Sequence, residues 1–181
     1  MKMTTMSHRL IFSLALVVPF VGCRSSSDHA RLTDPEVAMV VRVANLGEVR
    51  EGQLARDKAA DTAVRDFAQM MVTDHTAASN KAEADLARAG IPSEDSQLSR
   101  QIDANSGTAT ESLKASAAGR DFDRAYMDRQ VEVHRTILGV IDQTLVPNAH
   151  AKALKTVLTD MRKTVQDHLT RAQQVQSNLA R

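Results

Sequence analysis

The chain has 181 residues, which suits one domain preceded by a leader. Aromatic residues make up only 3% of it, so the core must be built from aliphatic side chains and methionine, a composition that favours packed helices over sheets. The formal net charge is +1, with no basic stripe and almost no aromatic side chains to stack on bases. These properties exclude nucleic acid as an expected partner.

Residues 1–22 are predicted to be a signal peptide. A start containing Lys2 and Arg9 but no acidic residue precedes an apolar run over residues 10–21. This run is much shorter than the roughly 20 residues that a membrane-spanning helix needs, so it is better explained as the apolar part of an export signal.

The leader ends in Phe20-Val21-Gly22-Cys23, which resembles a bacterial lipobox with Cys23 as the acylated residue. Cys23 is the single cysteine of the chain, and acylation would spare the protein a free thiol in an oxidising compartment. The polar residues that follow indicate that residues 23–33 are a lipidated cysteine and a flexible tether. The alternative is ordinary signal cleavage, which leaves Cys23 as a free thiol.

From residue 34 onward the apolar residues recur with helical spacing, and no stretch alternates as a strand would. Asp34-Pro35 predicts a helix start, and Gly90-Ile91-Pro92 predicts a helix stop. We expect long helices over 35–58, 62–89, 121–145 and 149–179, a short helix or irregular connection over 96–117, and a tight turn at Val146-Pro147-Asn148. The predicted fold of residues 34–181 is an all-α, four-helix bundle of two helical hairpins with a short extra helix in the connection.

Ionisable residues interrupt the apolar stripe of every long helix. At 100° per residue, His75, His134 and His168 fall on the inward arcs of their helices, as do Glu48 and Glu51. Counted from the predicted turns, Glu48, His75 and His134 lie near one level if the hairpins point the same way. His134 and His168 differ in height by about 12 Å at roughly 1.5 Å per residue, so they are not expected to share an ion.

Three interpretations of this inward polar set remain open. The residues could form a hydrogen-bonded polar layer that sets helix register, together with Tyr126, Asn45 or Gln130. They could bind a transition metal such as Fe, Mn, Zn or Cu, with Glu48, His75 and His134 as candidate ligands. The histidines could also respond to pH. We assign Glu51, Tyr126, Gln130 and His168 to a secondary polar group around the candidate ligands.

Motifs of enzymes are missing from the sequence: it has no nucleophile elbow, phosphate loop, cysteine cluster or His-Glu-x-x-His motif. A diiron site would place Glu three residues before each histidine, where this chain has Val72 and Val165. We therefore do not expect an enzyme, and oxygen-activating diiron chemistry is disfavoured.

Several segments resemble an exported bacterial family catalogued as domain of unknown function 4142, which is grouped with ferritin-like folds. They are Val43-Ala44-Asn45-Leu46-Gly47-Glu48, Leu54-Ala55, Val64-Arg65-Asp66-Phe67-Ala68, Met71-Val72-Thr73-Asp74-His75-Thr76, Phe122-Asp123-Arg124-Ala125-Tyr126-Met127-Asp128 with His134, and Asp167-His168-Leu169. The likeness covers about residues 36–177. It implies a periplasmic helical bundle, often a lipoprotein facing the outer membrane, with no established activity, and it covers Glu48, His75, Tyr126, His134 and His168.

Three functions follow as hypotheses. The first is a non-enzymatic protein of the bacterial envelope, periplasmic and lipid-anchored to the outer membrane, with an unidentified protein partner or a role in stress survival. The second is a ferritin-like metal-binding or metal-dependent redox protein that uses the inward Glu and His residues. The third is a pH sensor.

Overall fold

The computed structural model describes residues 31–179, and within that range every regular element is helical. The long helices are α1 (Asp34–Lys58), α2 (Thr62–Arg88), α3 (Gln97–Ala115), α4 (Arg120–Val140) and α6 (Lys152–Leu179), and between the last two lie a π-helical turn, η1 (Ile141–Leu145), and the short helix α5 (Val146–Asn148). The predicted all-α bundle is thereby confirmed. The predicted signal peptide and Cys23 lie outside the described residues.

Local sequence signals explain where the helices begin and end. Thr33 caps α1 in a reciprocal arrangement with Glu36, and the Asp61 side chain accepts from the first backbone N–H groups of α2. Gly90 follows α2 with a φ of 70°, and Gly119 precedes α4 with a φ of 110°. Glycine tolerates these positive values, so the chain can turn sharply at both places.

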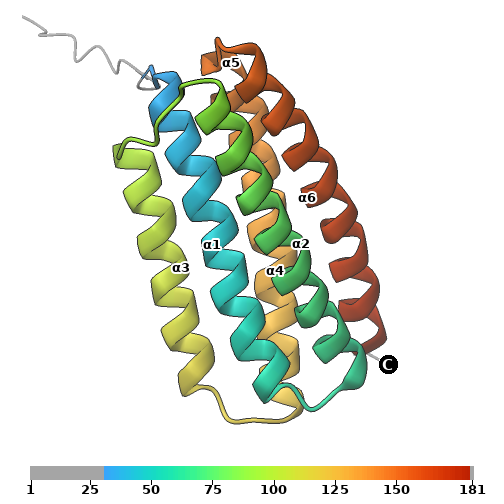
Figure 1. The fold of residues 1–181 in the computed structure, drawn as a ribbon. Coiled ribbons are helices and arrows are strands. Elements are labelled where there is room, and N and C mark those ends of the chain that lie inside the picture. Colours follow the sequence, from blue (N-terminus) through green and yellow to red (C-terminus); the bar gives the residue numbers. More distant parts are fainter. Residues whose placement is uncertain (1–30, 180–181) are drawn as a thin grey trace, which may run out of the picture.

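The helices form two hairpins that pack against each other (Figure 1). Helix α1 packs along α2, α4 packs along α6, and α2 contacts α6, whereas α1 and α4 touch little. Helix α3 lies along the outer side of α1 and reaches α4 (Figure 1). The expected short connection is therefore a 19-residue helix, and its sequence concealed this because its buried residues are mostly small and polar: Ser99, Ser106, Thr110 and Leu113.

The turn predicted at Val146-Pro147-Asn148 is wrong, because these three residues form α5. The chain continues as a helix through η1 and α5 and turns only after Asn148, before α6 begins at Lys152. Pro147 lacks the N–H that an α-helix would bond to the carbonyl of Gln143, and the wider π turn falls directly before it.

Two carboxylates, the buried Asp123 and the partly exposed Asp34, bond to the turns at the ends of the hairpins. Asp123, near the start of α4, accepts hydrogen bonds from the backbone N–H groups of Ala60 and Asp61 at 3.0 and 2.8 Å. At the opposite end, Asp34 accepts from the N–H groups of His150 and Ala151 at 2.7 and 2.9 Å. Each hairpin turn is thus held by a side chain of the other hairpin, which sets their relative height.

The apolar core consists of two clusters with polar residues between them. One cluster gathers the beginning of α1 and the first half of α6, and the other gathers the end of α1, the beginning of α2 and the end of α6. On each of the four core helices, buried polar side chains lie between these clusters: Asn45, Glu48 and Glu51 on α1, His75 on α2, Gln130 and His134 on α4, and His168 on α6. Asp123 of α4 is also buried, but it lies at the end of the bundle.

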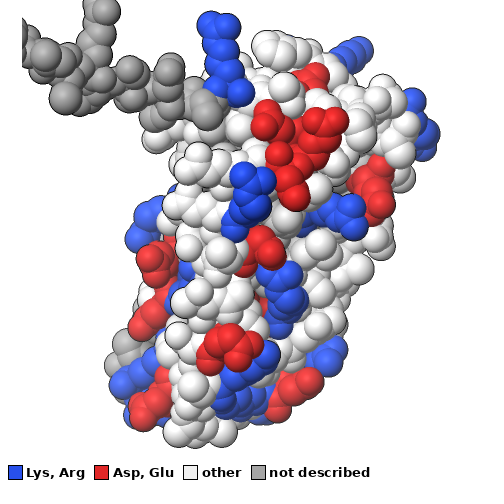
Figure 2. Space-filling model, turned by 90° about the vertical axis from the view of Figure 1, so that its left-hand side faces the viewer, with Lys and Arg blue, Asp and Glu red and all other residues white. Residues whose placement is uncertain are grey.

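Lys and Arg side chains alternate with Asp and Glu side chains on the face that α3 covers (Figure 2). Among residues 31–179, no helix has both the length and the apolar composition needed to cross a membrane.

Candidate metal centre

Three histidines from three helices meet in the middle of the bundle. His75 of α2, His134 of α4 and His168 of α6 are all buried. One ring nitrogen of each lies within 4.8 Å of the corresponding nitrogens of the other two. The ring centroids are 5.9 Å apart for His75 and His134, 5.0 Å for His75 and His168, and 5.6 Å for His134 and His168.

The expected 12 Å offset between His134 and His168 is therefore wrong. The offset was counted from a turn at Pro147, whereas the chain turns at residues 149–151. Counted from that turn, the two histidines differ by about two residues, or about 3 Å along the helix axis. The helix that passes through Pro147 is thus what brings His168 level with His134.

Each imidazole makes one hydrogen bond, and each bond goes to an oxygen outside the cluster. Nδ1 of His75 lies 2.9 Å from Oδ1 of Asn45, and Nδ1 of His134 lies 2.9 Å from the backbone carbonyl oxygen of Gln130. Nε2 of His168 lies 3.0 Å from Oδ2 of Asp74. The orientation of the Asn45 amide is set by its Nδ2, which donates to the carbonyl of Val41 at 2.8 Å.

These bonds fix the tautomer of every ring. A carbonyl or carboxylate oxygen can only accept, so the ring nitrogen facing it must carry the proton. The remaining nitrogens then present lone pairs: Nε2 of His75, Nε2 of His134 and Nδ1 of His168. All three are buried and have no hydrogen-bond partner among the described residues.

Burial keeps the three rings uncharged. Desolvation lowers the pKa of His75 well below its usual value, and the neighbouring histidines lower it further. Desolvation also lowers the pKa of His134, to about 4, and the pKa of His168 is lowered for the same main reason. At neutral pH the rings are therefore neutral imidazoles, the form that binds metals.

Three buried acceptors without donors are costly, at about 1–3 kcal/mol each. A bound divalent transition metal would use all three lone pairs at once. Metal-binding histidines characteristically donate their other N–H to a carbonyl or carboxylate, and all three histidines do so here. Three imidazole donors suit Zn, Cu, Ni or Fe and do not suit Mg or Ca.

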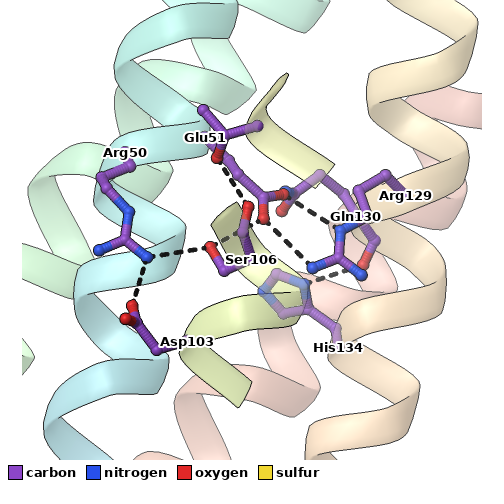
Figure 3. Close-up of polar contacts among 8 residues, drawn as sticks. Arg50, Glu51, Asp103, Ser106, Arg129, Gln130 and His134 are labelled. Atoms are coloured by element: carbon purple, nitrogen blue, oxygen red, sulfur yellow. Dashed lines mark hydrogen bonds and ion pairs between the residues drawn. The ribbon is translucent and has the colours of Figure 1, made fainter. Parts of the chain in front are cut away.

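Next to the histidines lies a network built around Glu51 (Figure 3). Its carboxylate receives two hydrogen bonds from Arg129 at 3.2 Å, one from Ser106 at 3.2 Å and one from Gln130 at 3.4 Å. Desolvation raises the pKa of Glu51 to about 7, and the nearby Glu48 carboxylate adds to this shift. Glu51 is thus an anchor for α3 and α4 on α1, and its side chain does not belong to the histidine cluster.

Glu48 faces a cavity that it shares with two of the histidines. The cavity has a volume of about 170 Å³ and is lined by Glu48, His75 and His134 at its buried end. Oε2 of Glu48 is buried without a partner among the described residues, and burial raises the pKa of Glu48 to about 7. The same desolvation raises the pKa of Tyr126 well above its usual value, and its hydroxyl also has no partner within residues 31–179.

The structure thus brings together His75 and His134 from the candidate ligand set, adds His168 from the secondary group, and leaves Glu48 beside the cluster. Sequence reasoning missed Asp74, Arg129 and Ser106. Asp74 carried a signal, since Asp precedes His in both Val72-Thr-Asp-His75 and Val165-Gln-Asp-His168. Asp74, from the first of these two segments, contacts His168 in the second, and this pairing is visible only in the folded chain.

The fold and the buried polar layer define the class of the molecule as an all-helical bundle. A family model described as "Domain of unknown function (DUF4142)" matches residues 22–175, which is most of the chain. The chain belongs to this family, as its sequence segments indicated. Searches of curated proteins and of solved structures found no match.

Proposed function

We propose that this protein binds one transition-metal ion through His75, His134 and His168 and works as an exported metal-binding bundle. The observation that carries the proposal is the convergence, within 4.8 Å, of three buried imidazole nitrogens. Their tautomers and lowered pKa values leave the lone pairs available. This favours the second of the three functions considered from the sequence, with His168 taking the place of Glu48 among the ligands.

Zn²⁺ and Cu²⁺ fit the site best, because three nitrogen donors follow the preferences of these ions and Cu²⁺ binds most tightly in the divalent series. The test is elemental analysis and metal titration of the untagged Cys23→Ser protein that lacks residues 1–22, so that no free thiol competes for the ion. We expect one ion per chain and a rise in Tm on adding Zn²⁺ or Cu²⁺, because an ion that binds only the folded state stabilises it.

The variant His134→Ala should lose the metal and the rise in Tm, since two ligands remain. His150→Ala is the matched control, because His150 lies in the turn before α6 and its side chain belongs to no ligand cluster among the described residues. A wild-type protein that takes up no ion and melts at the same temperature with and without Zn²⁺, Cu²⁺, Fe²⁺ and Mn²⁺ contradicts the proposal.

The second part of the proposal concerns location. We infer that the chain is exported to the periplasm and held at the outer membrane by a lipid on Cys23. The apolar run over residues 10–21 and the placement of the single cysteine directly after Gly22 support this. Labelled palmitate should be incorporated into the wild-type chain in cells and not into Cys23→Ser, and labelling of neither chain would remove the anchor from the proposal.

A further inference from the structure

The cavity beside the histidines runs from the metal centre to the surface. Its buried end is formed by Glu48, His75 and His134, and its outer residues Asn105, Glu132 and Thr136 are exposed. The cavity lies between α1 and α4, whose backbones approach each other at few places, and α3 packs over the gap between them. The route therefore passes between α1, α3 and α4.

Apolar side chains make up much of the cavity wall, and polar residues such as Ser106 and Arg129 also line it. The apolar residues of the wall include Val43, Ala44, Ile102, Val133 and Ile137. Its volume of about 170 Å³ accommodates several waters or a ligand of a few heavy atoms. One wall is firmly held, because Ser106 and Arg129 both bond to the Glu51 carboxylate (Figure 3).

At the buried end of the cavity, one oxygen of the Glu48 carboxyl group lacks a hydrogen-bond partner among the described residues. This oxygen, Oε2, is itself buried. Glu48 is also not a member of the ligand cluster, which holds only the three histidines. A carboxylate oxygen in this position can accept a hydrogen bond from a molecule that sits between it and the ion.

We propose that the metal held by the three histidines carries an exchangeable small ligand, water or another compact oxygen or nitrogen donor, that enters through this cavity and hydrogen-bonds to Glu48. The inference rests on the proposed metal site. Three protein ligands leave the fourth position of a tetrahedral ion to an external molecule, which is the pattern of reactive sites and differs from the closed four-ligand pattern of structural ones. Glu48 is a positioning residue for that molecule.

A groove on the other side of the bundle offers a competing route. It runs between α2 and α6, and Asp74 and His168 line it. However, the nitrogen of His168 that faces this groove is already bonded to Asp74, and its free nitrogen is buried. The cavity under α3 is therefore the route to which we assign the exchange.

The experiment uses the Cu²⁺-loaded Cys23→Ser protein that lacks residues 1–22, which has no thiol to reduce Cu²⁺, with azide as the small donor. Bound exchangeable water should raise the relaxation rate of solvent protons above that of the Zn²⁺-loaded protein. Azide should abolish this increase and give a new charge-transfer absorption. A protein that binds Cu²⁺ but shows neither effect overturns the inference and leaves the metal site standing, whereas a protein that binds no Cu²⁺ overturns the proposed function itself.

Two matched substitutions test the route. Ile102→Trp narrows the cavity from α3, which carries no metal ligand, and should weaken azide binding by about tenfold or more while Cu²⁺ still binds. Ala77→Trp places the same bulk on an exposed position of the competing groove and should change azide binding little. The reverse pattern, or equal effects of the two, refutes the assigned route.

A third substitution tests Glu48. Glu48→Gln removes a negative charge next to the ion and supplies an amide donor, so it should tighten azide binding at pH 8 by about fivefold. Glu132→Gln removes a charge at the exposed mouth of the same cavity and is the control. Equal azide affinities in Glu48→Gln and the wild type would remove Glu48 from the proposal.

Discussion

At the scale of single residues, the hydrogen-bond partners of the three imidazoles are stronger evidence for a metal site than the presence of the imidazoles alone. A buried histidine can simply fill space, but each of these rings is held by an oxygen on one side and left without a partner on the other. Only the folded chain reveals this arrangement, because Asn45, Asp74 and the carbonyl of Gln130 belong to different helices or to the backbone.

Asp74 should tune the affinity for the metal without being a ligand. Its carboxylate accepts the Nε2 proton of His168 and thereby makes the ring a better donor. We expect Asp74→Asn to weaken Zn²⁺ binding by about 10- to 100-fold, measured by competition with a chelating dye.

Asp160→Asn provides the control for this change. Asp160 lines the same groove but pairs with Lys81 and not with a histidine. It should leave the affinity for Zn²⁺ unchanged, and equal losses in the two variants would show that Asp74 acts through the charge of the groove.

The buried acids and histidines give the metal-free protein opposing responses to pH. The pKa of His134 is lowered to about 4, so the unfolded chain binds more protons as the pH falls from about 6.5, and stability decreases on acidification. The pKa values of Glu48 and Glu51 are raised from 4.5 to about 7, so the folded chain binds more protons between those values. Their contribution to stability is therefore present below pH 4.5 and lost as the pH rises through 7.

Removing both acids should leave the pH dependence of the free energy of unfolding to the histidines. We expect the double variant Glu48→Gln, Glu51→Gln to lose stability more steeply than the wild type when the pH falls from 6.5 to 4.5. Urea midpoints in the presence of a chelator measure this, and parallel curves for the two proteins would contradict it.

At the scale of helices, the sequence predicted what capping and periodicity control and failed where packing decides. The ends of α1 and α2 follow from Pro35, Asp61 and Gly90, and were predicted within one or two residues. The length of helix α3 was underestimated, because Ser106 packs closely against Gly47 of α1 and no apolar side chain marks this contact. A Cβ atom added to Gly47 would lie 2.7 Å from the Ser106 hydroxyl oxygen. A close approach of this kind leaves no apolar stripe to detect.

The height of His168 could not be predicted because one proline was assigned to a turn. Proline usually ends a helix, and only the η1 segment before Pro147 allows the chain to continue. An error of a few residues at the turn moved the expected height of His168 by about 9 Å, which is less than two helical turns. Inward direction was therefore predictable for all three histidines, whereas their convergence was not.

The hairpin heights should depend on Asp123. Replacing it by alanine removes the acceptor of two backbone N–H groups in the turn between α1 and α2 and should lower the free energy of unfolding by about 2–4 kcal/mol. Urea denaturation measures the effect. Asp121→Ala, an exposed neighbour on the same helix, should cost less than about 1 kcal/mol, and a similar loss in both would contradict this role for Asp123.

At the scale of the whole molecule, the two apolar clusters are separate and the polar layer interrupts the core between them. Each cluster draws residues from both hairpins, so either could hold the hairpins together over its own half of the length. The middle of the bundle carries unpartnered polar atoms in the metal-free state and is the weakest section of the core.

The three ligands come from α2, α4 and α6, and none comes from α1 or α3. An ion at their centre would act as a cross-link between two long stretches of chain, as a disulfide does, and would restrict the unfolded ensemble most where the enclosed loops are longest. Removing the ion with a chelator would then remove the cross-link between the hairpins at the middle of their length. Amide exchange should quicken first on both sides of that level, ahead of either end of the bundle.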